Sequence, residues 1–174
     1  MKANLYWFTG LSGAGKTTIA SAFFKIIRKS KKNIIFLDGD TLREILTENQ
    51  KYSLIERKKL AIKYSKFCKM ILDQDIDVVI ATISMFHEIR DWNRENIDNY
   101  SEVYIKVPLE VLIERDQKNI YSRALKGEIK DVMGVDITLQ EPRNPDVVIL
   151  NDGSSSPSEI VEEILTQLHL NNKI

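Results

Sequence analysis

The stretch Gly10-Leu11-Ser12-Gly13-Ala14-Gly15-Lys16-Thr17, followed by Thr18, decides the fold of this chain. It matches the P-loop pattern, in which a glycine and four residues precede Gly-Lys-[Ser/Thr]. Residues 4–9 before it have the composition of a buried strand, and residues 17–29 after it carry apolar side chains at helical spacing. A glycine-rich turn between a strand and a helix presents backbone N–H groups to phosphate oxygens. The pattern therefore predicts a nucleoside triphosphate site, in which Lys16 contacts the β- and γ-phosphates and Thr17 ligates Mg²⁺.

The composition is that of one globular domain. The chain has 174 residues, of which 43% are hydrophobic, and this suffices for a single core. Its 25 basic and 25 acidic residues cancel, so no overall field attracts a nucleic acid polymer or a membrane surface. The single cysteine, Cys68, excludes an internal disulfide and suits a reducing compartment. Without a signal peptide or an apolar run of membrane-spanning length, the chain is expected to be soluble and cytoplasmic.

Strand-like and helix-like segments alternate along the whole chain. This alternation predicts a three-layer α/β P-loop fold, with a five-stranded parallel sheet covered by helices on both faces, in one domain over residues 1–174. The polar and basic segment 116–145 contains glycines and prolines, and we expect it to be a mobile lid rather than part of the core. Further strands are expected at residues 33–37, 77–82, 102–107 and 147–150, and further helices at residues 41–47, 53–72, 86–97, 109–115 and after Ser156.

Polar side chains follow the predicted strands, where a sheet of this kind binds its ligands. Asp38 and Asp40 could organise Mg²⁺ through its waters, accept a proton from an attacking hydroxyl, or only form a turn that caps the next helix. Arg43 lies on the first turn of that helix. Arg57, on the apolar side of the following helix, could meet a substrate phosphate or a structural carboxylate. Ser84 could contact a substrate or cap a helix.

Two missing motifs narrow the class of protein. The third strand ends in Ala81-Thr82-Ile83-Ser84 without an acid, which counts against a motor-type ATPase, and no Asn-Lys-x-Asp motif follows later, which counts against a GTPase. Tyr52 and Phe86 lie near strand-end loops where a base could stack. The basic residues in and beside the lid could neutralise a transferring phosphoryl group and exclude water, or the segment could be only a solubilising loop. These residues are Arg115, Lys118, Arg123, Lys126 and Lys130.

These landmarks together resemble the adenylylsulfate (APS) kinase family. The resemblance implies ATP-dependent phosphorylation of a ribose 3′-hydroxyl on a small nucleotide, usually by a homodimer. The matching segments are residues 9–18, 36–40 with Arg43, 83–84 with 90–91, 107–111, 114–116, 120–121, 127–130 and 144–145. Together with the motifs above, the resemblance implies catalytic roles for Lys16, Asp38, Asp40 and Ser84. It also implies an ATP site that consists of the P-loop with Arg115 and Lys118. The acceptor site becomes Asp40, Arg43, Tyr52, Arg57, Ile83, Ser84, Phe86, Lys130 and Val132, and Mg²⁺ is assigned to Thr17 with Asp38 or Asp40 through water.

The sequence departs from this family where the base of the acceptor is recognised. The family places adenine between two phenylalanines, and this chain has Tyr52 and Val132 in their places. An expected asparagine is Leu60, and the usual Ser-Pro-Tyr/Phe is Ser84-Met85-Phe86. The pattern is similar to a divergent branch found in bacterial capsule gene clusters, whose enzymes phosphorylate the 3′-hydroxyl of cytidine diphosphoramidate. Because a pyrimidine is smaller than adenine, we favour this acceptor over APS.

Two further functional classes stay open at this point. A kinase for a non-nucleotide metabolite, such as a sugar, would leave Tyr52 and Arg57 without a role. A regulatory protein that binds nucleotide without turnover would not need the combination of Lys16, Thr17 and a basic lid. Both classes are therefore less favoured than a nucleotide kinase.

Overall fold

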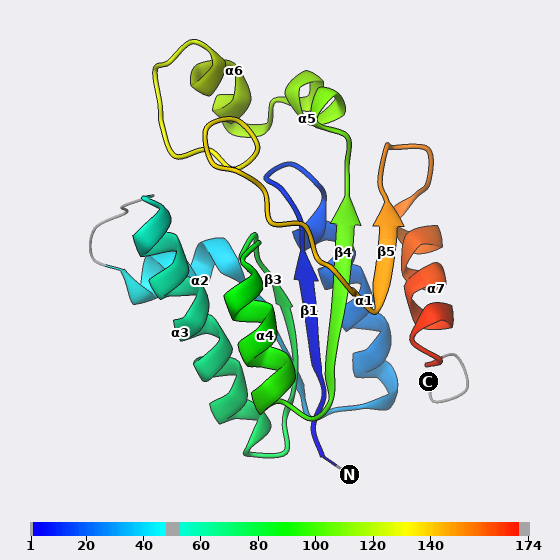
Figure 1. Ribbon diagram of the computed structural model, residues 1–174. Helices are drawn as coiled ribbons and strands as arrows, with labels where there is room; N and C mark the ends of the chain where they lie inside the picture. The colour runs from blue at the N-terminus through cyan, green and yellow to red at the C-terminus, as the bar shows by residue number, and fades with distance from the viewer. Residues whose placement is uncertain (1, 48–52, 171–174) are drawn as a thin grey trace.

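A parallel five-stranded sheet forms the centre of the molecule (Figure 1). The structure is a computed structural model that describes residues 2–47 and 53–170. The strands lie in the order β2-β3-β1-β4-β5, and each neighbouring pair is parallel, as the sequence predicted. The strands are β1 (Leu5–Thr9), β2 (Ile34–Asp38), β3 (Asp77–Ala81), β4 (Tyr100–Lys106) and β5 (Val147–Leu150).

Helices cover both faces of this sheet and confirm the predicted three layers. Helix α1 packs against α7 on one face, and α3 packs against α4 on the other (Figure 1). In residues 2–47 and 53–170, no helix combines the length and the apolar composition needed to cross a membrane. The helices are α1 (Lys16–Ser30), α2 (Gly39–Leu46), α3 (Leu54–Leu72), α4 (His87–Asn96), α5 (Leu109–Arg115), the 3₁₀ helix η1 (Gln117–Asn119), α6 (Ile120–Leu125) and α7 (Pro157–Gln167).

The central strand β1 is buried along its whole length. Phe23 of α1 packs edge-on against Tyr6 and at a tilt against Phe8, with ring centroids 5.0 and 5.3 Å apart. Each such buried side chain stabilises the fold by roughly 1.5–3 kcal/mol. Cys68 is also buried, as predicted, and burial raises the pKa of its thiol well above the ordinary value. The strand that leads into the P-loop is therefore held rigidly in the middle of the core.

The segment 116–145 is more structured than we expected. It contains η1 and α6, and its side chains Tyr121, Val132 and Met133 are buried in the core. The Tyr121 hydroxyl donates a hydrogen bond of 2.8 Å to the carbonyl of Ser12 in the P-loop. The expectation that this segment takes no part in the core is therefore wrong, because a few apolar side chains within the polar sequence pack against the site-forming elements.

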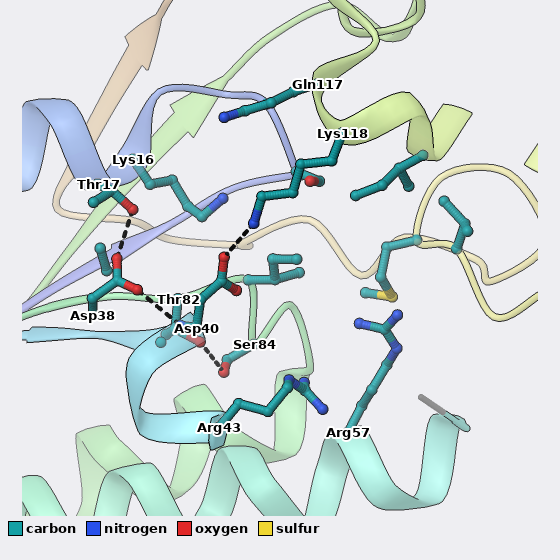
Figure 2. Close-up of a pocket in the computed structure, with 18 of the residues that line it drawn as sticks. Lys16, Thr17, Asp38, Asp40, Arg43, Arg57, Thr82, Ser84, Gln117 and Lys118 are labelled. Carbon is teal, nitrogen blue, oxygen red and sulfur yellow. Dashed lines mark hydrogen bonds and ion pairs between the residues drawn. The ribbon is translucent and has the colours of Figure 1, made fainter. Parts of the chain in front are cut away.

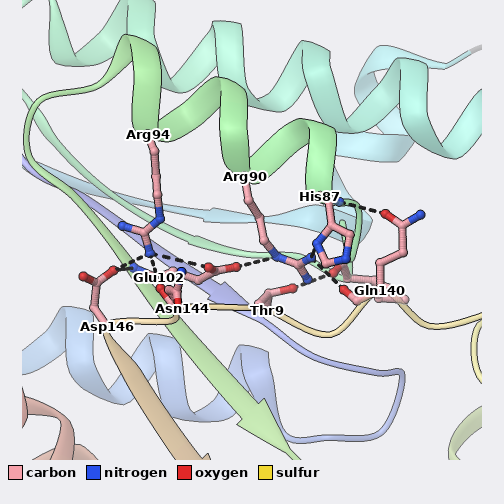
Figure 3. Close-up of polar contacts among 9 residues, drawn as sticks. Thr9, His87, Arg90, Arg94, Glu102, Gln140, Asn144 and Asp146 are labelled. Carbon is pink, nitrogen blue, oxygen red and sulfur yellow. Dashed lines mark hydrogen bonds and ion pairs between the residues drawn. The ribbon is translucent and has the colours of Figure 1, made fainter.

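A buried ion pair fixes the C-terminal end of this segment to the sheet (Figure 3). Arg90 of α4 donates through Nε to Glu102 of β4 at 2.7 Å, and the two side chains are only 5% and 1% exposed. Arg90 also donates to the Gln140 carbonyl at 2.6 Å, and Arg94 donates to the Asn144 carbonyl at 2.7 Å. Burial raises the pKa of Glu102, and the neighbouring arginines oppose that shift. Each charge in the buried pair needs the other, so the pair stays together. Through the bonds to Gln140 and Asn144 the network holds the C-terminal end of segment 116–145 in one position.

Candidate active site

A cavity of about 610 Å³ lies beyond the carboxyl ends of β1, β2 and β3 (Figure 2). The P-loop, α2, α3, the residues after β3 and the segment 116–145 enclose it. Most of the site residues that the sequence predicted line this cavity together. They are Ser12, Gly13, Gly15, Lys16, Thr17, Thr18, Asp38, Asp40, Arg43, Arg57, Ile83, Ser84, Phe86, Lys118, Lys130 and Val132.

Four described residues that the sequence predicted are not among those that line the cavity. Gly10, Leu11 and Ala14 belong to the P-loop but are buried behind its phosphate-facing side. Arg115 lies at the end of α5, where its guanidinium donates to the Asn151 carbonyl at 3.1 Å. Tyr52 lies outside the described residues. The assignments of Arg115 to ATP and of Tyr52 to the acceptor therefore stay predictions.

The glycines of the P-loop are required by its backbone geometry. Gly13 and Gly15 have φ angles of 76° and 86°, in the left-handed region that disfavours residues with a Cβ. A Cβ on Gly10 would lie 2.4 Å from the carbonyl oxygen of Ile105, closer than any side chain allows. The Asn151 side chain donates to the Ala14 carbonyl at 2.9 Å, which joins the loop to the end of β5. The loop is therefore built in advance as a phosphate-binding turn at the start of α1.

Lys16 reaches across this loop toward the position of a bound triphosphate. Its Nζ donates to the Leu11 carbonyl at 2.7 Å. Burial lowers the pKa of Lys16 to about 8, although the carboxylates of Asp40 and Asp38 pull in the opposite direction. A lysine with this pKa is partly deprotonated at mildly alkaline pH, and a triphosphate beside it would favour the protonated form.

The affinity for ATP is expected to fall as the pH rises above about 8. The pKa of Lys16 in the free protein lies below its ordinary value of 10.5, so above about pH 8 most of the free protein has a neutral Lys16. At such a pH, ATP must either bind next to a neutral lysine or bind together with a proton. The Kd for ATP should then increase by up to about tenfold per pH unit. Calorimetric titration between about pH 7 and 9.5 measures this dependence. In the control variant Lys16→Arg the guanidinium keeps its proton, so the Kd for ATP should hardly change with pH. If the Kd of the wild-type protein were equally independent of pH, Lys16 would not be the residue that binds the phosphates.

Asp38 joins the P-loop helix to the start of α2. Its Oδ2 accepts a hydrogen bond of 2.8 Å from the Thr17 hydroxyl. Its Oδ1 accepts the backbone N–H groups of Asp40 and Thr41 at 3.0 and 3.3 Å, so Asp38 also caps α2. The capping interpretation and the functional interpretation of Asp38 are therefore compatible.

Asp40 is placed differently, although only Gly39 separates it from Asp38. Its carboxylate is exposed and accepts a hydrogen bond of 2.9 Å from Lys118 of η1 (Figure 2). Gly39 is required between the two acids, because a Cβ there would lie 2.8 Å from the carbonyl oxygen of Ala81. Asp40 is thus the acid that faces the open cavity.

Thr17 and Asp38 bring two hard oxygen donors to one point beside the P-loop. Mg²⁺ prefers oxygen ligands and keeps several waters while it binds substrate phosphates, so one hydroxyl with a nearby carboxylate fits this ion. Among the described residues, no three His, Cys, Asp or Glu side chains gather as a ready-made metal site. A magnesium ion here would accordingly take its remaining ligands from phosphate and water.

Ser84 lies in a constrained position after β3. Its φ angle of 23° is unusual for a serine, and its Oγ lies 2.8 Å from Oγ1 of Thr82 in a shared hydrogen bond. Helix α4 begins only after Phe86 and has no side-chain cap. The interpretation of Ser84 as a helix cap is therefore wrong, and its side chain contributes to the cavity instead.

Two arginines and a set of apolar side chains form the side of the cavity opposite the P-loop. Arg43 comes from α2 and Arg57 from α3 (Figure 2). Arg57 donates through Nη2 to the carbonyl of Asp131 at 2.6 Å, and its expected contact with a substrate phosphate stays a prediction. We call the apolar side chains beside these arginines the acceptor wall, and it consists of Leu60, Phe86, Ile129, Val132 and Met133.

Several lining residues were not assigned from the sequence. The sequence contained an indication for Gly39 and Thr82, because residues at or just after the carboxyl end of a predicted strand are expected at the ligand site. Ile120, Ile129 and Met133 had a weaker signal, as apolar residues in the polar segment 116–145. The residues concerned are Gly39, Glu44, Tyr64, Ala81, Thr82, Gln117, Ile120, Ile129 and Met133.

The fold and this site define a P-loop kinase. The family model for adenylylsulphate kinase matches residues 2–150. The chain belongs to this family, as its motifs indicated. It is 46% identical over 172 residues to the cytidine diphosphoramidate kinase of Campylobacter jejuni, covering 98% of this chain and all of that relative. It is 34% identical over 165 residues to a probable adenylyl-sulfate kinase of Pyrococcus abyssi, covering 95% of this chain and 94% of that relative.

Solved structures agree with this assignment. The APS kinase of Mycobacterium tuberculosis, in complex with AMPPNP and APS, is 29% identical and has a TM-score of 0.84, covering 97% of this chain and 98% of that one. Shikimate kinase from Aquifex aeolicus has a TM-score of 0.61 at 20% identity, which is a likeness of fold alone, with 97% of this chain and 98% of that one covered. The predicted fold class is therefore confirmed.

Proposed function

We propose that this protein transfers the γ-phosphate of ATP to the ribose 3′-hydroxyl of cytidine diphosphoramidate. The observation that carries the proposal is the contrast between the two sides of the cavity. The P-loop side keeps each group that a kinase needs, while the acceptor wall has aliphatic Leu60 and Val132 in place of the family's asparagine and phenylalanine. A wall of this kind suits a base smaller than adenine. The 46% identity to a cytidine diphosphoramidate kinase supports the same acceptor.

On the donor side, ATP would place its phosphates on the backbone N–H groups of the P-loop. Lys16 would hold the β- and γ-phosphates, and Thr17 with Asp38 would hold Mg²⁺, which supplies charge neutralisation for the transfer. Lys118 pairs with Asp40 in the structure. Because Lys118 lines the cavity, its ammonium group could stabilise the transferring phosphoryl group once ATP is bound.

On the acceptor side, Asp40 would accept the proton of the 3′-hydroxyl, because it is the exposed acid of the pair and Asp38 is engaged by Thr17 and by the start of α2. Arg43 and Arg57 would hold the phosphates of the acceptor, since guanidinium groups bind phosphate oxygens in pairs. Ser84 would contact the ribose or phosphate from the end of β3.

Release of ADP in a coupled assay with ATP, Mg²⁺ and one acceptor at a time tests this function. We expect turnover with cytidine diphosphoramidate, slower turnover with APS, and none with a sugar acceptor that lacks phosphate. CDP serves as the control for the amidate group. Equally negligible rates with all of the nucleotides would contradict a 3′-kinase, and would leave a regulatory protein as the better account.

APS is the second candidate acceptor. The side of the cavity that would hold ribose and phosphate, with Arg43, Arg57 and Ser84, does not depend on the base. A neighbour with 29% identity was solved with APS, which supports this alternative. Homodimer formation and a cytoplasmic location, both expected from the sequence, stay predictions.

A further inference from the structure

Residues 131–137, which we call the 131–137 turn, fold back on themselves beside the cavity. The Val132 carbonyl accepts the backbone N–H groups of Val135, Asp136 and Ile137 at 3.1, 3.2 and 3.2 Å. These bonds close a loop that belongs to no helix or strand of the sheet. The turn presents Val132 and Met133, both buried, as part of the acceptor wall.

The side chain of Asp136 holds the entrance of this turn, although the residue is exposed and does not line the cavity. Its Oδ2 accepts the N–H of Asp131 at 2.6 Å, and its Oδ1 accepts the N–H of Val132 at 2.5 Å. Hydrogen bonds to a carboxylate of this length are strong. They fix Asp131 at a φ of 63°, a conformation that residues with a Cβ rarely adopt.

The same turn lies against α3, which carries Arg57 of the proposed acceptor site, and close to Leu11 of the P-loop. The Asp131 carbonyl accepts the 2.6 Å hydrogen bond from Arg57 of α3. On the other side Gly134 faces the P-loop, since a Cβ there would lie at van der Waals distance, 3.4 Å, from Cδ1 of Leu11. The turn therefore lies between α3 and the P-loop, and because Asp131 and Val132 are consecutive, a change at its entrance would move the Arg57 contact and Val132 together.

We infer that Asp136 is a positioning residue for the acceptor nucleotide, acting through the 131–137 turn on Val132 and on Arg57. This inference rests on the proposed function, because it assigns the acceptor to that wall. Without the Asp136 carboxylate, the N–H groups of Asp131 and Val132 would turn to water and Asp131 could leave its left-handed conformation. Val132 and Met133 would then no longer be held in place within the acceptor wall, while the phosphate-binding part of the P-loop would keep its own contacts.

Steady-state kinetics of Asp136→Asn and Asp136→Ala, with ATP and cytidine diphosphoramidate, test this inference. We expect the acceptor KM to rise about 5-fold in Asp136→Asn, which keeps one acceptor oxygen, and about 20-fold in Asp136→Ala. The KM for ATP should stay within about twofold of the wild type in both variants. Asp98→Asn is the matched control, because Asp98 is an exposed aspartate at the amino end of β4, and it should change neither KM.

The outcomes separate a positioning role from a purely structural one. Equal increases of both KM values would overturn the inference, since they indicate general loosening of the protein. An acceptor KM that stays unchanged in both Asp136→Asn and Asp136→Ala would overturn the inference about Asp136. It would leave the proposed function standing. If Asp136→Ala does not fold, Asp136→Asn decides by the same split between the two KM values. A wild-type protein that phosphorylates no nucleotide would reject the proposed function and this inference with it.

Discussion

Replacing Lys16 by alanine is expected to lower kcat by about a thousandfold or more, because phosphoryl transfer depends on fixed positive charge at the β- and γ-phosphates. The side chain crosses the P-loop to the Leu11 carbonyl and lies among the cavity-lining residues. Lys16 is the first residue of α1, directly after the phosphate-binding turn, and no other described lysine or arginine has this position. Another basic residue is therefore not expected to replace it. The measurement is single-turnover and steady-state ADP release at saturating ATP and acceptor.

The loss should not come from unfolding. Burial lowers the pKa of Lys16. This shift means that the charged side chain costs the ligand-free protein some of its folding stability. Lys16→Ala should therefore keep or raise the Tm of the ligand-free protein while activity disappears. Lys25→Ala, an exposed lysine on the same helix, is the control and should leave kcat and Tm unchanged. A Lys16→Ala enzyme that retains most of its kcat would refute the proposed donor site.

The second large effect is expected at Asp40. Asp40→Asn should lower kcat by about 100- to 10,000-fold, because an amide cannot accept the proton of the attacking hydroxyl. The KM for ATP should change less than kcat, because Asp40 contacts Lys118 but, within the described residues, forms no hydrogen bond to the P-loop. The dependence of the rate on Mg²⁺ concentration should also be unaffected.

Asp38→Asn gives the contrast that separates the two acids. Asp38 accepts the Thr17 hydroxyl and two N–H groups of α2, so its loss should raise the Mg²⁺ concentration required for half-maximal rate. It should change the stability of the protein little, because asparagine keeps the side-chain oxygen that caps α2 and is as good an N-cap as aspartate. If Asp40→Asn rather than Asp38→Asn altered the Mg²⁺ requirement, the two roles would have to be exchanged.

The parts of this structure that the sequence predicted well are those with local causes. The P-loop pattern demands left-handed glycines at Gly13 and Gly15, and the residues on either side have strand and helix periodicity, so fold and donor site follow from short stretches. The strand-end rule then brings residues from separate loops to the same cavity. Asp38, Arg57 and Ser84 are far apart in the chain, and the structure places all three on its lining.

The parts that the sequence did not predict depend on contacts between distant segments. Tyr121 and Val132 are isolated apolar residues in a polar stretch, and no periodicity indicates that they are buried against the P-loop and the acceptor wall. Asp38 and Asp40 give the same signal in the sequence. Only the positions of Thr17 and Lys118 distinguish them.

Arg57 shows a related limit. Its place on the apolar side of α3 indicated an interaction in the interior, but a carbonyl oxygen such as that of Asp131 leaves no mark in the sequence. The expected contact of Arg57 with a substrate phosphate stays a prediction, and the Asp131 carbonyl is a contact that side-chain chemistry alone did not indicate. Backbone acceptors in irregular loops can be found only once the fold has brought them together.

The central claim, that the acceptor wall selects a cytidine nucleotide, is tested most directly by competition. The enzyme is given ATP, Mg²⁺ and equal concentrations of cytidine diphosphoramidate and APS, and the ratio of the two 3′-phosphorylated products gives the ratio of their kcat/KM values. We predict a ratio of about 10 or more in favour of the cytidine product, with the new phosphate on the ribose 3′-oxygen by phosphorus NMR. A majority of phosphorylated APS would contradict this account.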